Sequence, residues 1–223
     1  MHLNPASSPD LSPDTKSRLL EAAGEVFAEV GFKSATVREI CQKAGANIAA
    51  VNYHFRDKEG LYRAAIEFTA GCALAKYPIG GGVDAAAPAP ERLRVFIRTY
   101  LNRLLDEGRP AWHGKLISRE MVEPTAALDH LAETFARPQY TRLRGIVGEL
   151  LGPGASEELK RRCAASIVGQ CLFYKLCRPM IQRLMPEQGY DGDSLDALAC
   201  HIAEFSLAAI ESLRQGSTKA RTP

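Results

Sequence analysis

The sequence predicts an all-α fold, with a small N-terminal domain of three helices followed by a larger helical domain. Apolar residues recur every three or four positions along almost the whole chain of 223 residues, and this spacing places them on one face of a helix. Alternating polar and apolar runs, which indicate strands, are scarce. With 46% hydrophobic and 24% charged residues, the chain has the composition of a globular protein that buries a sizeable core.

Capping residues mark the first two helices. Asp14 precedes a run of apolar residues at helical spacing that stops at Gly31. Glycine is a common C-cap, so a first helix is predicted to end at Gly31. Thr36 stands three residues before Glu39, the spacing of a capping box, and Gly45 closes the short second helix. A brief link between Gly31 and Thr36 therefore separates two helices.

Two further helices follow at once. Asn47 is a suitable N-cap for a third helix, which carries Val51 and Phe55 on its apolar face. Asp57 opens a longer fourth helix that ends near Pro78.

The larger domain contains a break in composition. Residues 78–90, PIGGGVDAAAPAP, have no periodic face and indicate a flexible connector. Helices are then predicted from Pro90 to Gly108, from Trp112 to Glu123 and from Thr125 to Leu151, the last one broken near Pro138.

Two long helices complete the chain after a turn at 152–154. They cover about 156–185, with a kink at Pro179, and 193–214. The last helix has a narrow apolar stripe of the kind that packs against other helices, formed by Leu195, Leu198, Ile202, Phe205, Ala209 and Leu213. The chain thus divides into a tail at 1–13, a first domain at 14–62, a second domain at 63–215 and a tail at 216–223.

Composition excludes several classes of protein. Lys and Arg number 28 against 26 Asp and Glu, so the net charge is only +2, which argues against a polybasic, sequence-blind binder of nucleic acid. There is no run of eighteen or more apolar residues that would span a membrane, and the N-terminus lacks the pattern of a secretory signal. The six cysteines fit no zinc or disulfide spacing. We therefore expect a cytoplasmic protein with reduced thiols and neither metal nor cofactor.

An enzyme is also disfavoured. The five histidines are scattered, and HExxH, GxSxG and phosphate-loop motifs are absent from the sequence. His113, Glu120 and Glu123 lie on one short helix, but their spacing is only weak evidence for a metal site. We expect no catalytic residues.

The chemistry is expected in the first sixty residues. A helix, a tight turn and a second helix occupy residues 36–55, which is the helix-turn-helix arrangement whose second helix enters the major groove of DNA. Between positions 33 and 63, six Lys and Arg face three Asp and Glu, a modest excess that suits phosphates. On spacing alone, a helical hairpin in an unrelated bundle remains an alternative.

The second helix of this motif is sparsely charged. Asn52 has the amide geometry to pair with adenine or with a phosphate, and the methyl groups of Ile48 and the neighbouring alanines suit thymine methyl groups. Tyr53 and His54 can reach backbone phosphates.

The DNA-binding domain of the tetracycline-repressor (TetR) family resembles one run of this sequence along its whole length, residues 15–62: TKSRLLEAAGEVFAEVGFKSATVREICQKAGANIAAVNYHFRDKEGLY. The specific elements are AAGEVFAEVGF, then TVREI, then Ala44-Gly45, and finally YHF followed by Lys58-Glu59 and Leu61. The resemblance implies a homodimeric, ligand-responsive transcriptional regulator, usually a repressor.

The resemblance also implies roles for residues at matching positions. The phosphate contacts of the family fall on Thr36, Asn52, His54 and Lys58. Its contacts to base edges fall on Val37, Ile48, Ala49, Ala50 and Tyr53. Arg38 and Asn47 complete the candidate DNA-binding set.

Two positions depart from the family pattern. Residue 52 is Asn where many relatives have Tyr, and residue 37 is Val where the name-giving repressor has Arg. These departures concern base reading and leave the docking mode unchanged.

A second resemblance covers pieces of the remaining chain. AAVNYHF, SREMVEPTAAL and SIVGQCLFYKLCRP are similar to the CecR branch of the TetR family. This similarity implies a connection with genes that affect antibiotic sensitivity and efflux.

The resemblance implies a four-helix dimer interface from the helices at 156–185 and 193–214. Small residues would let backbones approach and larger ones would supply area; the candidates are Ala165, Gly169, Leu198, Ile202, Phe205 and Ala209. Packing within one chain is the alternative explanation of the stripe. Two reading helices are needed because one reads too few base pairs, so the operator is expected to be near-palindromic.

An effector pocket is expected between the helix at 57–77 and the helices spanning 91–185. Its candidate lining combines aromatic and polar side chains: Phe96, Tyr100, Trp112, His113, Arg119, Glu120, Glu123, Gln170, Phe173 and Tyr174. A structural ion pair is an equally good explanation of Arg119 and Glu120, and Trp112 alone is more often a core residue. A protein-interaction module that never touches DNA is the remaining alternative function.

Overall fold

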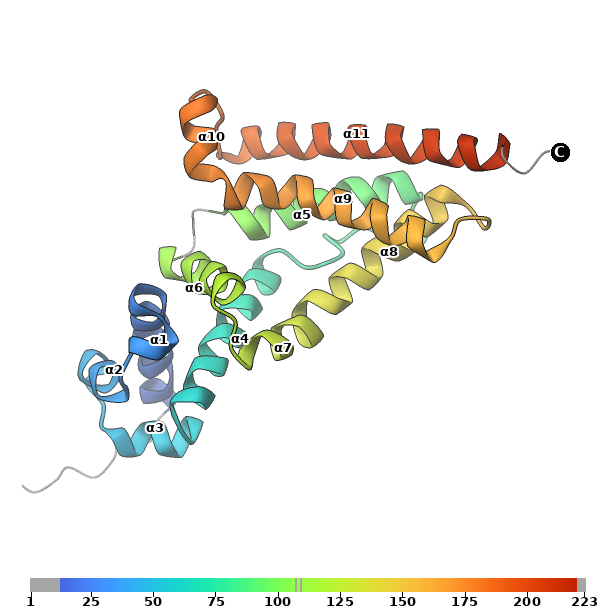
Figure 1. Cartoon of the computed structure of the whole chain (residues 1–223). Helices are drawn as coiled ribbons and strands as arrows, with labels where there is room; N and C mark the ends of the chain where they lie inside the picture. Colours follow the sequence, from blue (N-terminus) through green and yellow to red (C-terminus); the bar gives the residue numbers. More distant parts are fainter. Residues whose placement is uncertain (1–12, 107, 109, 220–223) are drawn as a thin grey trace, which may run out of the picture. The chain divides into compact units, whose positions relative to one another are not determined.

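The computed structural model of the protein describes residues 13–106, 108 and 110–219, with side chains described through residue 215 (Figure 1). Every regular element in these residues is a helix. None of the described helices is both long and apolar enough to cross a lipid bilayer. The chain divides into two compact units, and the described residues of the N-terminal unit are 13–72 and 110–132.

The N-terminal unit is assembled from two stretches of chain. Its helices are α1 (Pro13–Ser34), α2 (Val37–Ala44), α3 (Ile48–Phe55), most of α4 (Lys58–Lys76), α6 (Ala111–Val122) and α7 (Ala127–Leu131). Fully buried side chains from these helices form its core, among them Leu19, Phe27, Ile40, Val51, Leu61, Ile66 and Leu116. The predicted boundary at 62/63 misses this arrangement, because packing against α1 brings α6 into the unit.

Helix α1 continues past its predicted end. Gly31 has φ 81° and ψ 167°, so it kinks the helix, which then runs on to Ser34. The N–H of Ala35 donates to the Gly31 carbonyl at 3.1 Å. Glycine takes this positive φ without a Cβ penalty, and the residue predicted to end the helix therefore bends it.

The C-terminal unit packs long helices around a second core. Its elements are α5 (Ala89–Leu105), most of the π-helical turn η1 (Ala132–Ala136), α8 (Arg137–Leu151), α9 (Glu157–Leu176), α10 (Arg178–Leu184) and α11 (Gly192–Lys219). Leucine, isoleucine and small side chains from α5, α8, α9 and α11 fill this core. Helix α9 lies alongside α11 (Figure 1). Helix α11 extends through the start of the segment predicted to be a tail.

Two prolines lie where the predicted breaks occur. Pro138 lies in the first turn of α8, directly after η1. Pro179 lies in the first turn of α10, where Cys177 separates that helix from α9. A first-turn proline needs no backbone donor, so both prolines begin helices. The connector at 78–90 contains a series of turns, closed by the N–H groups of Gly81, Val83 and Ala87.

Candidate nucleic-acid interface

The helix-turn-helix is fixed by local capping. Thr36 Oγ1 accepts a hydrogen bond from the Glu39 N–H at 3.1 Å, which caps α2. Gly45 ends α2 in the left-handed conformation, with φ 60° and ψ 38°. Asn47 Oδ1 accepts from the Ala50 N–H at 3.0 Å, which caps α3. These three residues have the capping roles that the sequence predicts.

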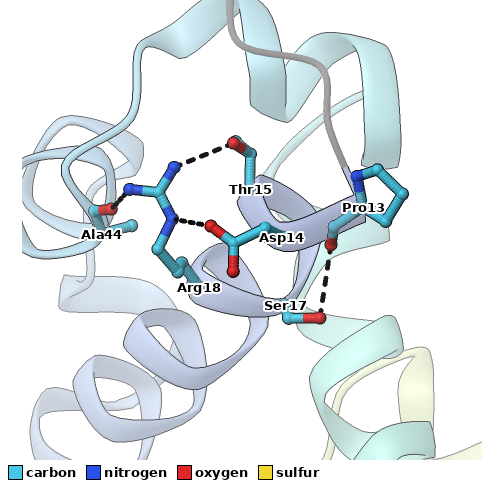
Figure 2. A network of polar contacts seen from close by, with 6 residues as sticks. All are labelled: Pro13, Asp14, Thr15, Ser17, Arg18 and Ala44. Atoms are coloured by element: carbon cyan, nitrogen blue, oxygen red, sulfur yellow. Dashed lines mark hydrogen bonds and ion pairs between the residues drawn. The ribbon is translucent and has the colours of Figure 1, made fainter.

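An arginine of α1 also holds the end of α2, next to the turn (Figure 2). Arg18 Nη1 donates to the Ala44 carbonyl at 3.1 Å, and Nη2 donates to Thr15 Oγ1 at 2.9 Å. Its Nε lies 3.1 Å from a carboxylate oxygen of Asp14. A cation at the carbonyl end of α2 also interacts favourably with the helix dipole. No pattern in the sequence singles out Arg18, because its partner carbonyl lies 26 residues away.

One face of α3 is exposed and carries groups suited to reading bases. Ile48 is 51% exposed and Tyr53 is 66% exposed. Ala49 and Asn52 are exposed beside them. We call Ile48, Ala49, Asn52 and Tyr53 the reading face. The exposed apolar surface of Ile48 is chemically suited to contact with thymine methyl groups.

The prediction that Ala50 contacts a base edge is wrong. Its side chain is only 1% exposed, because it points into the core with Val51 and Phe55. A methyl group in that position cannot reach a base edge. Since α3 makes a full turn every 3.6 residues, Ala49 faces outward while Ala50 faces inward.

The remaining candidate DNA-binding residues differ in their exposure and in their contacts within the protein. Thr36 and Arg38 are exposed, whereas Val37 is half-buried. His54 is half-buried, and its Nε2 is buried without a hydrogen-bond partner in the described residues. Lys58 Nζ donates to the Lys33 carbonyl at 3.3 Å and lies 4.7 Å from the centre of the Phe32 ring. The ammonium group of Lys58 is therefore already held by α1.

Two residues predicted to contact an effector instead hold α1. A Cβ built at Gly24 would stand 2.1 Å from the Trp112 ring, so the indole lies against the α1 backbone. Arg119 Nη1 donates to the Glu29 carbonyl at 3.0 Å and to the Ala28 carbonyl at 3.4 Å. Trp112 and Arg119 therefore serve the packing of the N-terminal unit.

A buried carboxylate joins α6 to α4. Glu120 has no exposed surface; its Oε2 accepts from the Tyr62 hydroxyl at 2.6 Å, and its Oε1 accepts from the Thr125 N–H at 2.8 Å. Burial and this hydrogen bond raise the pKa of Tyr62 above its usual value. His113 is buried on the same helix, and its ring meets Phe68 edge to face.

Glu123 is exposed and lies at a small cavity. The cavity has a volume of about 170 Å³ and is lined by Phe32, Lys33, Tyr62, Arg119, Glu123, Pro124 and Thr125. Lysine, arginine and glutamate side chains meet there beside the rings of Phe32 and Tyr62, so the lining combines charged and apolar groups.

The other predicted effector contacts lie in the C-terminal unit, in separate places. Buried Phe96 stacks on Tyr100, with ring centres 5.9 Å apart. Gln170 donates to Ser206 Oγ at 3.3 Å, between α9 and α11. Phe173 is 46% exposed, and Tyr174 borders another depression with His201.

Arg103 is a buried cation that sequence patterns do not reveal. Its side chain is buried, and its Nη1 donates to the Tyr77 carbonyl at 2.7 Å. Its guanidinium lies 5.6 Å from the centre of the Tyr100 ring. Desolvation lowers the pKa of Arg103 to about 10.

A groove runs along α9 and α11. It has a volume of about 380 Å³, and its lining includes Cys163, Ser166, Gln170, Phe205, Ala209 and Leu213. Phe205 is 60% exposed and Leu213 is 43% exposed. Ala165, Gly169 and Ala209 are exposed as well.

The prediction that Leu198 and Ile202 lie on the dimer surface is wrong. They are 7% and 1% exposed, because they pack into the core of their own unit. The narrow stripe of α11 therefore has two parts, one facing the core and one, around Phe205 and Ala209, facing outward.

Comparison with known proteins defines the class. Residues 19–65 match the model for bacterial regulatory proteins of the tetR family. Residues 89–210 match the model for the C-terminal domain of the HTH-type transcriptional dual regulator CecR. The chain therefore belongs to the TetR family of DNA-binding transcriptional regulators. Within that family, it carries a C-terminal domain of the CecR type.

Individual relatives agree with this assignment. HTH-type transcriptional dual regulator CecR of Shigella flexneri is 29% identical over 199 residues, which cover 84% of this chain and 89% of that protein. HTH-type transcriptional regulator UidR of Escherichia coli K12 is 39% identical over 69 residues, covering 30% of this chain and 35% of UidR.

Solved structures share the fold. A putative transcriptional regulator from Pseudomonas aeruginosa PAO1 matches with a TM-score of 0.66 at 21% identity, covering 92% of this chain and 96% of that one. FadR from Bacillus subtilis, in complex with stearoyl-CoA, matches with a TM-score of 0.61 at 19% identity, covering 86% and 97%. The predicted all-α regulator is confirmed in fold and family, and the family is one of regulators rather than enzymes.

Proposed function

We propose that this regulator is a homodimeric repressor that binds a near-palindromic operator and is released by a small molecule. The reading face carries the proposal: four exposed side chains, two of them large and apolar, on a helix capped at a rigid turn. One such helix covers only a few base pairs, so selective binding needs a second copy about one helical turn away.

The groove on α9 and α11 supports pairing of two copies. Exposed Phe205 and Leu213 would be covered by a second chain, while the small residues Ala165, Gly169 and Ala209 would let helices of the two copies approach closely. A symmetric dimer uses the same patch on both partners, and this patch is built from two adjacent helices of one unit.

We also propose that the effector binds in the C-terminal unit, which carries the aromatic candidates Phe96, Tyr100, Phe173 and Tyr174. FadR of Bacillus subtilis has been crystallised with stearoyl-CoA, which supports a small-molecule effector in this fold. A hundredfold loss of operator affinity needs only about 2.7 kcal/mol of differential binding between two conformations.

From the CecR resemblance, we propose that the target genes act in antibiotic sensitivity and efflux. We also propose that the regulator works in the cytoplasm. Because the Shigella relative is named a dual regulator, activation at some promoters is the competing possibility. Transcript levels of the genes beside its own, measured with and without the protein, distinguish the two: repression predicts higher transcripts in its absence.

A gel-shift with DNA from upstream of its own gene tests operator binding. Wild type should bind at low salt and lose affinity steeply as salt rises. Tyr53→Ala should weaken binding to this DNA about tenfold. Leu184→Ala, at an exposed residue of α10 in the C-terminal unit, should leave binding unchanged. Salt-independent or absent binding would favour a protein-interaction module.

A further inference from the structure

Arg56, directly after the reading helix, has an unusual backbone conformation. Its φ is 73° and its ψ is −52°, and it is the one non-glycine residue with positive φ in the described part of the chain. These angles are close to those of the rare, strained form of the γ-turn. Strain of this kind persists only where the surrounding structure imposes it, and it is frequent at functional sites.

The tight link between α3 and α4 imposes this conformation. Only Arg56 and Asp57 connect Phe55, the last residue of α3, to Lys58, the first of α4. Asp57 Oδ1 accepts from the Gly60 N–H at 2.8 Å and so caps α4. A Cβ at Gly60 would stand 2.0 Å from the Phe55 carbonyl oxygen, which shows how closely the two helix ends approach.

Glycine would relieve the strain at position 56, yet an arginine is present. Its side chain is exposed and makes no hydrogen bond or ion pair with any described residue. The two residues that follow it are occupied, because Asp57 caps α4 and Lys58 is held by the Lys33 carbonyl. The guanidinium is therefore uncommitted at the C-terminal end of the helix that bears Asn52 and Tyr53.

We propose that Arg56 binds a DNA phosphate, and that it is present at a strained position because the reading helix needs a cation at its end. The proposal deepens the proposed function, since it requires α3 to be the helix that meets DNA. A guanidinium presents a planar fork of donors that matches phosphate oxygens. Binding a phosphate adds affinity for any duplex and carries no base specificity.

The test uses the full chain and two labelled duplexes of equal length, one from its own upstream region and one of shuffled sequence. Affinity is measured by fluorescence anisotropy at several salt concentrations, and melting temperature is measured in parallel. The variants are Arg56→Gly, Arg56→Gln and Arg56→Lys. Arg161→Gln, an exposed arginine of α9, is the control for loss of one positive charge.

Opposite changes in stability and affinity are expected for Arg56→Gly. Its melting temperature should rise by about 2–4 °C because strain is released, while its affinity for both duplexes should fall about tenfold. Arg56→Gln should lose the same affinity without the gain in stability. In both, the slope of log affinity against log salt should decrease by about 0.9 for each phosphate that the variant no longer neutralises. Arg56→Lys should keep most of the slope.

Two results would overturn the proposal. One is a wild-type salt slope in both Arg56→Gly and Arg56→Gln, and the other is an equal decrease of the slope in Arg161→Gln. Failure of the proposed operator function gives a different result, in which wild type binds the upstream and shuffled duplexes equally well. The effect of Arg56 remains readable in that case, because non-specific binding also depends on phosphate neutralisation.

Discussion

The indole of Trp112 lies directly on the backbone of Gly24, so close that a Cβ there would stand 2.1 Å from the ring carbon Cζ3. This contact joins α6 to the first helix of the chain. Arg119, two turns later on α6, donates to the carbonyls of Ala28 and Glu29 on the same helix. The DNA-binding unit therefore depends on side chains far along the sequence from its helix-turn-helix.

A methyl group at residue 24 should disrupt this contact. Gly24→Ala is expected to lower the free energy of unfolding by about 1–3 kcal/mol, because overpacking displaces the Trp112 ring. Gly71→Ala is the matched control: Gly71 lies in α4, and a Cβ there meets nothing within 4 Å. That variant should gain about 0.5–1 kcal/mol from better helix propensity. Denaturant unfolding measures both, and equal effects would contradict the overpacking argument.

Tyr100 should make the protein sensitive to alkali. Burial raises its pKa to about 12, so above pH 10 the hydroxyl ionises in the unfolded chain but stays protonated in the folded one. The unfolded chain then binds fewer protons, and stability falls as pH rises between about 10 and 12.

Tyr100→Phe keeps the ring and removes this contribution. The free energy of unfolding of wild type should fall relative to that of the variant by about 1.4 kcal/mol per pH unit in this range, and the two should run parallel between pH 7 and 9. The variant should keep some decline from pH 9 upward, since burial raises the pKa of the Cys171 thiol to about 12. Parallel curves up to pH 12 would show that Tyr100 ionises as easily in the folded chain.

Thr36 should have two separable roles, as a helix cap and as a phosphate donor. Thr36→Ala removes the acceptor for the Glu39 N–H and should cost about 1 kcal/mol of stability. Ser156→Ala removes an equivalent cap on α9, where Ser156 Oγ accepts from the Leu159 N–H at 3.1 Å, and should cost a similar amount. Only Thr36→Ala should also weaken DNA binding, because its exposed hydroxyl can donate to a phosphate. If Ser156→Ala weakens binding equally, stability alone explains the effect.

Phe205 should control the oligomeric state. It is 60% exposed in the groove on α9 and α11, so Phe205→Glu should place a charge in the proposed interface and produce monomers. Leu184→Glu changes a side chain of α10 that is 71% exposed and lies outside the groove. Light scattering should show a dimer for wild type and Leu184→Glu, and a monomer for Phe205→Glu. A dimer in all three would place the interface elsewhere.

Local features of the fold could be predicted from the sequence. Thr36, Gly45 and Asn47 cap the helices they were expected to cap, because capping depends on residues three or four positions apart. The predicted break near Pro138 falls where α8 begins, because proline lacks the N–H that a helix interior needs. Ile48, Ala49, Asn52 and Tyr53 are exposed, as a DNA contact requires. Ala50 points inward, because its direction depends on how α3 is rotated against its neighbours.

Features that depend on distant contacts could not be predicted. The residues Trp112, Arg119 and Glu120 have the polar and aromatic character of a binding site, but their partners lie on α1 and α4. The apolar stripe of α11 has one spacing throughout, so only packing separates buried Ile202 from exposed Phe205. The strained angles of Arg56 have no signature in residue type, because they arise from the approach of two helix ends.

The discontinuity of the N-terminal unit has a consequence for synthesis and for engineering. During translation, residues 13–72 leave the ribosome well before the segment at 110–132 that completes their core. The DNA-binding half therefore cannot finish folding cotranslationally until the intervening part of the other unit has also emerged. A chimaera that exchanges reading heads between regulators should transplant both segments together, since a fusion at residue 72 would leave the α1 surface beneath Trp112 bare.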